Sequence, residues 1–278
     1  MKKFVDTVSK PLVSIVTPCL NGDQYIKECI DSVSSQGCSA NIEHIVVDGG
    51  STDNTIEILK QQKDLVWISE EDSGQSDAFN KGIKMAKGEW IVILDGDDVL
   101  LPGALKLYLS AINRDKNLDI IYGHTQFIDE KSNWIRNVVS VPFCYEYLIY
   151  DLAMPPSSGL MIRSEFIKEN LFDINHHFNM DTEWYLRCGR GLRAKVVNNY
   201  TIAFRFWGGN KTNVLFEKGV VPDEIVQERR ALDEKYKQSY VNNVSSFRII
   251  KLVNYYYFKV LYYRSKIIQK FLLIFRIN

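Results

Sequence analysis

The sequence lacks an excess of either charge, a long apolar run and any close pair of cysteines. Its 278 residues include 34 Lys and Arg and 34 Asp and Glu, which argues against a dedicated nucleic-acid binder because such proteins usually carry a basic excess. No apolar run reaches the roughly 18–20 residues that span a bilayer, and residues 1–10 lack the apolar core of a cleavable signal peptide. The five cysteines form no C-x-x-C pair, so we interpret them as reduced thiols and expect a cytoplasmic protein with neither a zinc site nor a disulfide framework.

The sequence also lacks the glycine-rich loops that bind phosphates in several classes of nucleotide-dependent enzyme. Neither G-x-x-x-x-G-K-[ST] nor G-x-G-x-x-G follows the first predicted strand, which weakens the NTPase and dehydrogenase alternatives. A nucleotidyltransferase would normally carry a glycine-rich, basic loop there, and "PCLNGDQY" is neither. An EF-hand does not fit, because Leu100 stands where the loop needs glycine and Lys106 where it needs glutamate.

The first 112 residues do contain a regular alternation of short apolar runs and amphipathic segments. Their spacing and turn residues predict strands and helices in turn, with Ser51 or Thr52 as the N-cap of the second helix. Alternating strands and helices indicate right-handed crossovers and a mostly parallel sheet covered on both faces. The predicted strands are 12–17, 42–47, 65–69 and 90–94, and the predicted helices are 23–36, 51–62, 76–86 and 103–112.

After residue 113 the pattern becomes mixed, and it should extend the same sheet. The predicted elements there are strands at 119–127, 134–139, 159–162 and 194–206 and a helix at 181–190.

Polar turns follow the four early strands, at 18–21, 48–51, 70–74 and 95–98. Ligands of open α/β sheets bind beyond the carboxyl ends of the strands, and three of these turns are acidic, so their carboxylates should converge. Converging carboxylates repel unless a cation or hydrogen-bond donors lie among them. Magnesium or manganese on a diphosphate would satisfy them; a single carboxylate could instead accept ribose hydroxyls or a uracil imide. Taken alone, an Asp-x-Asp sequence is more often a turn than a metal site.

Four segments, in the order usual for that family, resemble family 2 glycosyltransferases, which have the nucleotide-sugar-binding GT-A fold. The matching segments are "VSIVTPCLN", "VVDGGSTDNT", "EDSGQSDAFNKGIKMAKGEWIVILDGDD" and "MDTEWYLRCG". The resemblance covers residues 12–210. It implies an α/β GT-A catalytic domain at 1–215, with a nucleotide-binding half at about 12–112 and an acceptor half at about 113–215. Residues 216–278 would form a C-terminal helical tail.

The resemblance assigns the nucleotide-sugar-binding residues to the ends of the early strands. It implies that Asp48 holds the nucleotide base and that Pro18 and Asn21 line the same pocket. Asp72 and Gly74 should lie beside that pocket. Two further residues, Asp77 and Asn80, should brace the sugar-nucleotide loop.

The remaining roles concern the metal and the chemistry. The resemblance implies that Asp97 binds Mn²⁺ or Mg²⁺ on the diphosphate, while Asp95 contacts the ribose, or the metal through water. Asp98 is expected to stabilise the turn before Pro102. Asp181 should be the general base, although an acid in a first helical turn is also a common stabilising feature. This sequence has Met180-Asp181 where the family usually has Glu-Asp.

The resemblance implies an inverting transfer of a hexosyl or N-acetylhexosaminyl group from a nucleoside-diphosphate sugar, with UDP favoured, to a saccharide hydroxyl. The absence of Q-x-x-R-W disfavours processive synthesis. An acceptor on a lipid carrier and a role in surface polysaccharide biosynthesis are expected from family habit. The alternative is an inactive sugar-nucleotide-binding or assembly protein on the same fold, and a donor-hydrolysis assay separates the two.

Three further segments each allow more than one role. "MPPSSGLMIRSEF" is expected on the acceptor side or as an ordinary loop and strand, and Trp207 in "FRFWGGNKTN" either stacks on a sugar or packs in the core. Residues 246–278 are basic and aromatic without any acid. They would suit peripheral contact with the inner face of the plasma membrane, or packing on the catalytic domain or on a second copy of the chain.

Overall fold

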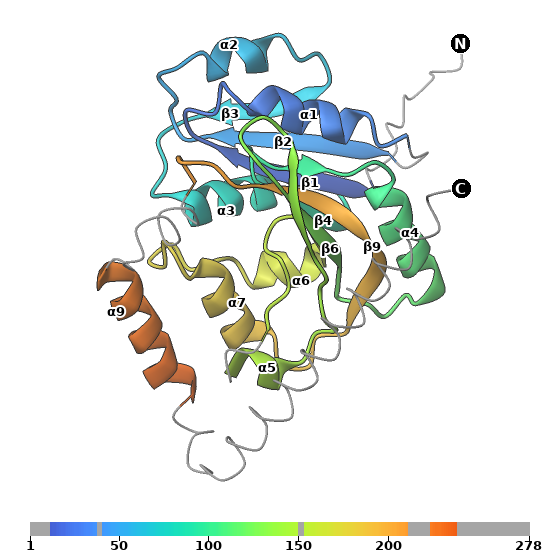
Figure 1. The fold of residues 1–278 in the computed structure, drawn as a ribbon, viewed down its shortest axis with the longest axis vertical. Helices are drawn as coiled ribbons and strands as arrows, with labels where there is room; N and C mark the ends of the chain where they lie inside the picture. Colours follow the sequence, from blue (N-terminus) through green and yellow to red (C-terminus); the bar gives the residue numbers. More distant parts are fainter. Residues whose placement is uncertain (1–11, 38–40, 150–152, 211–222, 238–278) are drawn as a thin grey trace, which may run out of the picture.

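The computed structural model describes residues 12–37, 41–149, 153–210 and 223–237 of the chain. They form one nine-stranded sheet with helices on its two faces (Figure 1). The strand order is β3-β2-β1-β4-β8-β6-β9-β5. Strand β7 is not part of this order and pairs with β6. The predicted α/β class with a mostly parallel sheet is therefore confirmed.

The first half of the sheet is parallel, because a helix between successive strands returns the chain to the same end of the sheet. Strand β1 pairs with β2 on one side and with β4 on the other, and β2 pairs with β3, all in parallel. The predicted elements are each found within a few residues of their expected bounds. They are β1 (Val13–Cys19), α1 (Ile26–Ser34), β2 (Ile42–Asp48), α2 (Thr55–Lys60), β3 (Leu65–Ser69), α3 (Gln75–Met85) and β4 (Trp90–Ile93).

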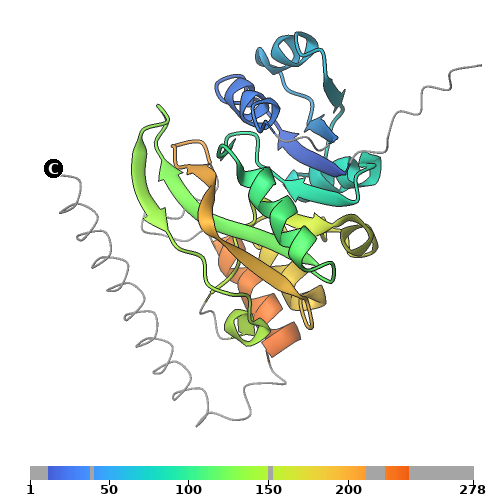
Figure 2. The same ribbon diagram turned by 90° about the vertical axis from the view of Figure 1, so that its right-hand side faces the viewer.

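The second half extends the same sheet in mixed directions, as expected. Strand β8 runs antiparallel to both β4 and β6, whereas β9 runs parallel to β6. Strands β6 and β7 form a hairpin at one edge of the described fold (Figure 2). The elements are β5 (Val99–Leu100), α4 (Ala104–Arg114), β6 (Ile120–Ile128), β7 (Trp134–Val138), α5 (Tyr145–Ile149), β8 (Leu160–Arg163), α6 (Ser164–Glu169), α7 (Met180–Cys188) and β9 (Ala194–Arg205).

The central strands are apolar throughout because helices cover both of their faces. Side chains of β4 alternate between two clusters: Ile91 and Ile93 pack with α3 and α7, and Trp90 and Val92 pack with α1 and α4. All four are 2% exposed or less. This burial fixes the register of β4 and so fixes the place of the acidic turn that follows it.

The predicted cap of α2 was wrong. The helix begins at Thr55, and the Thr55 N–H donates to Oδ1 of Asp53 at 2.9 Å. Ser51 is used otherwise, since its hydroxyl donates to Asp48 and accepts from the N–H of Asn21. The polar turn after β2 is thus tied to the neighbouring strand ends rather than to the helix.

After the gap at 211–222, the chain continues into α9 (Asp223–Leu232) and a π-helical turn, η1 (Asp233–Lys237). Leu232 is 1% exposed and belongs to the same core cluster as α3 and α7. No helix among the described residues is long and apolar enough to cross a membrane. The expectations for residues 246–278 lie outside the described residues, and the division at residue 215 stays a prediction.

Candidate active site

A cavity of about 600 Å³ lies where β1, β3 and β4 end. Its sheet-side wall comes from the turns after these strands, and its opposite wall comes from residues near the start of α7 and the end of β9. Seven of the ten predicted site residues line it: Pro18, Asn21, Asp72, Gly74, Asp95, Asp97 and Asp181. The other three, Asp48, Asp77 and Asn80, do not line it.

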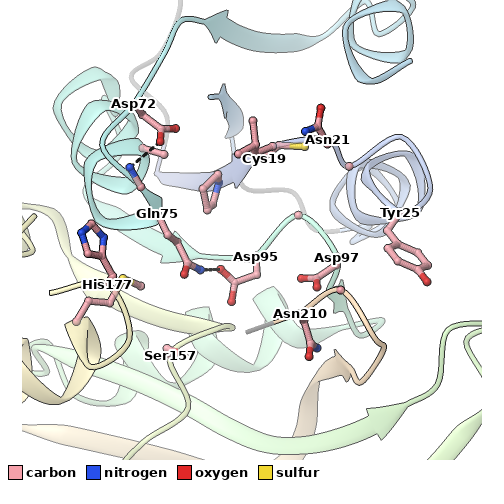
Figure 3. A pocket seen from close by; sticks show the side chains of 18 of the residues that line it. Cys19, Asn21, Tyr25, Asp72, Gln75, Asp95, Asp97, Ser157, His177 and Asn210 are labelled. Carbon is pink, nitrogen blue, oxygen red and sulfur yellow. Dashed lines mark hydrogen bonds between the residues drawn. The ribbon is translucent and has the colours of Figure 1, made fainter. Parts of the chain in front are cut away.

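The turn after β4 presents two carboxylates to the cavity. In Figure 3, Asp95 and Asp97 project from one turn, with Gln75 on one side of them and Tyr25 on the other. Gln75 Nε2 donates to Asp95 Oδ1 at 2.7 Å, and the indole N–H of Trp207 donates to Asp97 Oδ2 at 2.8 Å. Burial raises the pKa of Asp97, although the Trp207 hydrogen bond opposes this shift.

Asp98, the third acid of this turn, does not line the cavity. It is completely buried, and its Oδ1 accepts the backbone N–H of Arg205 at 2.9 Å. Burial, followed by the neighbouring charges of Asp97 and Asp95, raises its pKa well above the usual value. Asp98 therefore tethers the acidic turn to the end of β9, a structural role as expected, but with a different partner.

Gly96 is required by close packing of the chain itself. A Cβ at this position would lie 2.9 Å from the carbonyl oxygen of Pro18, closer than side chains tolerate. The acidic turn thus packs directly on the end of β1. This contact sets the position of both cavity carboxylates relative to Pro18.

The turn after β3 forms the adjoining part of the wall. Gly74 has a φ of +110°, which a side chain rarely tolerates, and its N–H donates to Asp72 Oδ1 at 2.8 Å. Asp77 lies behind this turn and accepts the N–H of Ser73 at 3.1 Å. The Asp72 carboxylate also approaches Gly49, where a Cβ would lie 2.5 Å from its Oδ2.

Asp48 lies beside the cavity rather than on its wall. Its carboxylate is buried, and Oδ2 accepts the N–H groups of Gly50 and Ser51 and the hydroxyl of Ser69, at 2.7–3.0 Å. These bonds order the turn after β2, and Asn21 closes against that turn through the N–H of Thr52 at 2.9 Å. The predicted contact between Asp48 and a base stays a prediction.

Asn80 pairs with the backbone of Phe172, and the expected bracing of the sugar-nucleotide loop stays a prediction. Its Nδ2 donates to the carbonyl of Phe172 at 2.8 Å, and its Oδ1 accepts the Phe172 N–H at 2.9 Å. Asn80 therefore joins α3 to the chain that leads into α7. This pairing satisfies a buried amide side chain, as burial requires.

Asp181 lies in the first turn of α7 and faces the cavity from the opposite wall. Its Oδ1 accepts the Thr182 N–H at 2.6 Å. Burial raises the pKa of Asp181, and the hydrogen bonds from Thr182 oppose that shift. A carboxylate with a raised pKa is a stronger proton acceptor than an ordinary aspartate, which suits a general base. His177, Phe178 and Ser157 complete this side of the cavity.

A buried arginine at the end of β9, Arg205, joins this strand to helix α1. The guanidinium of Arg205 is fully buried, pairs with Glu28 at 2.6 Å and lies 4.3 Å from the centre of the Tyr25 ring. Its Nε also donates to the carbonyl of Asp97 at 2.8 Å. The Trp207 ring meets Tyr25 edge-on at 5.0 Å. Trp207 thus lines the cavity as part of an aromatic and ionic network that holds the acidic turn.

The donor set at this turn fits a divalent cation. Among the described residues, no group of three or more His, Cys, Asp and Glu side chains is arranged to hold a metal. Magnesium or manganese on a diphosphate, however, needs only one or two protein carboxylates. Asp95 and Asp97 both face the cavity and supply hard oxygen ligands. A cation there would also offset the cost of burying the charge of Asp97.

A family model described as glycosyl transferase family 2 matches residues 14–189 of the chain. Glycosyltransferase GlyG of Streptococcus pneumoniae serotype 4 is 31% identical over 204 residues, which cover 67% of each protein. Chondroitin synthase of Escherichia coli is 34% identical over 198 residues, which cover 68% of this chain and 28% of the synthase.

Solved structures share the fold at low identity. S. aureus TarS 1–349 in complex with UDP-GlcNAc superposes with a TM-score of 0.63 at 20% identity, covering 79% of this chain and 65% of that one. The mannosyltransferase PcManGT from Pyrobaculum calidifontis, in complex with GDP-Man and Mn²⁺, gives 0.53 at 19% identity, covering 71% and 57%. The chain thus spans less than two thirds of either matched structure, and the likeness shows the fold alone.

The sheet and these neighbours define a protein of the GT-A fold. Because the family model matches more than half of its length, the chain belongs to glycosyltransferase family 2.

Several residues of the cavity carry no sequence signal that identifies them. The Gln75 contact with Asp95 and the Trp207 contact with Asp97 join residues 20 and 110 positions apart. Trp207 was expected to stack on a sugar or to pack in the core, and neither expectation includes a hydrogen bond to the acidic turn. His177 had no assigned role, although it precedes Asp181 by only four residues.

Proposed function

We propose that the chain is an inverting, non-processive glycosyltransferase that moves a sugar from a UDP-sugar to a hydroxyl of a saccharide acceptor. The observation that carries the proposal is the cavity itself. It brings the Asp95 and Asp97 carboxylates together with the turn after β1 on one side and Asp181 on the other. A diphosphate needs the Asp95 and Asp97 carboxylates and the turn after β1, and a nucleophilic hydroxyl needs Asp181.

In this mechanism each wall has its own task. Pro18, Asn21 and Asp72 border the nucleotide, with Asp48 ordering the turn next to them. Asp97 and Asp95 would hold Mn²⁺ or Mg²⁺, which neutralises charge on the departing nucleoside diphosphate when bound. The Mn²⁺ in the complex of PcManGT supports this choice of ion.

Asp181 acts on the acceptor. Its carboxylate takes the proton from the acceptor hydroxyl as that oxygen bonds to the anomeric carbon. The bond between the anomeric carbon and the diphosphate oxygen breaks at the same time, and its electron pair leaves with the nucleotide. A single displacement inverts the anomeric centre, so an α-linked donor gives a β-linked product.

The substrates are proposed from the relatives. UDP-GlcNAc in the TarS complex supports a UDP-sugar, with a hexosyl or N-acetylhexosaminyl group transferred. The likeness to chondroitin synthase supports a saccharide acceptor and a role in polysaccharide biosynthesis. We further propose a lipid-linked acceptor and a cytoplasmic, membrane-peripheral location, in keeping with the basic residues 246–278.

A donor screen tests this function. UDP-Glc, UDP-Gal, UDP-GlcNAc, UDP-GalNAc and GDP-Man are each incubated with the protein and Mn²⁺, and release of nucleoside diphosphate is measured. Release from one UDP-sugar, lost on chelation with EDTA, is the expected result. No release from any donor, together with tight UDP binding, would instead favour an inactive sugar-nucleotide-binding protein.

A further inference from the structure

The segment that leads into α7 forms part of the cavity wall, and it is held from outside the region matched by the family model. His177 and Phe178 line the cavity, and Asn179 is the N-cap of α7, two residues before Asp181. The family match ends at residue 189, whereas the partner of this segment, Glu228, lies on α9. Figure 1 shows α9 alongside α7.

Glu228 gathers three successive backbone N–H groups. Its Oε1 accepts the N–H of His177 at 3.1 Å, and its Oε2 accepts those of Phe178 and Asn179, both at 3.2 Å. The side-chain amide of Asn179 adds a fourth contact at 3.3 Å. Successive N–H groups that point at one carboxylate form a compact anion-binding arrangement.

The electrostatics support a carboxylate at this place. Partial burial opposes the ionised form of Glu228, but the hydrogen bonds from residues 177–179 outweigh it and lower the pKa of the side chain. The start of α7 also carries the positive end of the helix dipole, which favours a negative charge nearby. Glu228 is therefore ionised at neutral pH and accepts the hydrogen bonds from residues 177–179.

Helix α9 and the η1 turn that follows it hold α7 at two further points. Leu232 packs into the core cluster that contains Trp184 and Tyr185 of α7. The hydroxyl of Tyr236 donates to Oε1 of Glu183 at 3.0 Å. On the other side of the segment, the Ser76 hydroxyl of α3 donates to the carbonyl of His176 at 3.1 Å. Residues 176–179 are thus fixed between α3 and α9.

We propose that Glu228 is a positioning residue that holds residues 177–179, and through them Asp181, at the geometry needed for transfer. This inference rests on the proposed function, since it assigns Asp181 a proton to take. Glu228 does not line the cavity and acts only through the segment it binds. The catalytic unit then includes α9, beyond the predicted boundary at residue 215.

The test compares Glu228→Ala, Glu228→Gln and Glu224→Gln in the full chain. Glu224 lies on an exposed part of the same helix and is the matched control. Hydrogen exchange of peptides covering 176–182 is measured first. Loss of the carboxylate should speed exchange there by at least about tenfold, with Glu228→Gln intermediate because one amide oxygen can still accept. Unchanged exchange in Glu228→Ala would refute the contact.

Donor turnover then separates positioning from mere stabilisation. With Mn²⁺ and the donor that the screen identifies, kcat per folded molecule should fall about tenfold to a hundredfold in Glu228→Ala. The Kd of UDP should stay within about twofold of the wild-type value, since the hydrogen bonds of Glu228 go to residues 177–179 and not to the turns after β1 and β3. Partial rescue by Glu228→Gln is expected. A kcat equal to that of Glu224→Gln would overturn the positioning role. A wild-type chain inert toward every donor would refute the proposed function, while the exchange measurement would still decide whether the Glu228 contact exists.

Discussion

The two walls of the cavity are held in different ways. The sheet-side wall consists of the ends of β1, β3 and β4 and the turns that follow them, so strand register brings Pro18, Asp72 and Asp97 together. Contacts from Arg205 and Trp207 then hold the acidic turn in place. The opposite wall is fixed by side chains distant in sequence, above all Glu228. Nucleotide binding should therefore depend mainly on local turn chemistry, metal binding also on Trp207, and turnover on Glu228 as well.

Removing the central carboxylate of the sheet-side wall should have the largest effect. Asp97→Ala deletes the carboxylate proposed to hold the cation, which is worth several kcal/mol of transition-state stabilisation. Donor turnover with Mn²⁺ should fall by about a thousandfold or more, measured as nucleotide release. Asp98→Asn is the control within the same turn, because Asp98 does not line the cavity. The amide oxygen of the new side chain can still accept the backbone N–H of Arg205. Full activity of Asp97→Ala would exclude the metal role.

Removing the carboxylate of the opposite wall should reduce turnover without weakening nucleotide binding. Asp181→Asn keeps the size of the side chain but cannot take a proton, so turnover should fall at least about a hundredfold. The Kd of UDP with Mn²⁺ should not change, since Asp181 lies away from the nucleotide turns. Glu183 lies two residues further along the same helix and is buried against Arg187. An unaffected rate in Asp181→Asn would exclude it as the base.

Trp207 links the two walls and provides an intermediate case. Trp207→Phe removes the N–H that bonds Asp97 while keeping an aromatic ring against Tyr25. Partners that orient a metal ligand typically contribute about tenfold or more to metal affinity. Titration of Mn²⁺ in the presence of UDP should therefore show binding weaker by about tenfold. Tighter Mn²⁺ binding would mean that the indole competes with the ion instead of orienting the carboxylate.

The raised pKa of Asp181 predicts the smallest effects, on pH dependence. The base must be ionised, so kcat should fall as the pH drops through a midpoint above the ordinary aspartate value. The folded chain favours the protonated form, so the favourable contribution to stability is present at low pH and lost as the pH rises through the raised pKa. Asp181→Asn should then unfold at a higher temperature than the wild type at pH 7, with the difference shrinking as the pH falls. A difference that does not vary with pH would contradict this.

The sequence best predicted the site residues that lie directly after strand ends. The apolar runs of β1 to β4 end in polar turns, which predicted that the carboxylates of the three acidic turns converge. Asp72, Asp95 and Asp97 line one cavity, whereas Asp48 lies beside it. The position of Asp48 could not be predicted in this way, because a residue at a strand end can bond its own turn as readily as face a ligand. The Glu228 contact spans about fifty residues and leaves no periodic pattern, so only the folded structure reveals it.

The central claim is that the cavity binds a nucleoside diphosphate through a cation on Asp97. Calorimetric titration of UDP into the wild-type chain and into Asp97→Asn, each with Mn²⁺ and with EDTA, tests it most directly. The account predicts that Mn²⁺ strengthens UDP binding by the wild type at least about tenfold and has little effect on Asp97→Asn. Equal UDP affinity with and without Mn²⁺ in the wild type, or the same gain in both proteins, would contradict it.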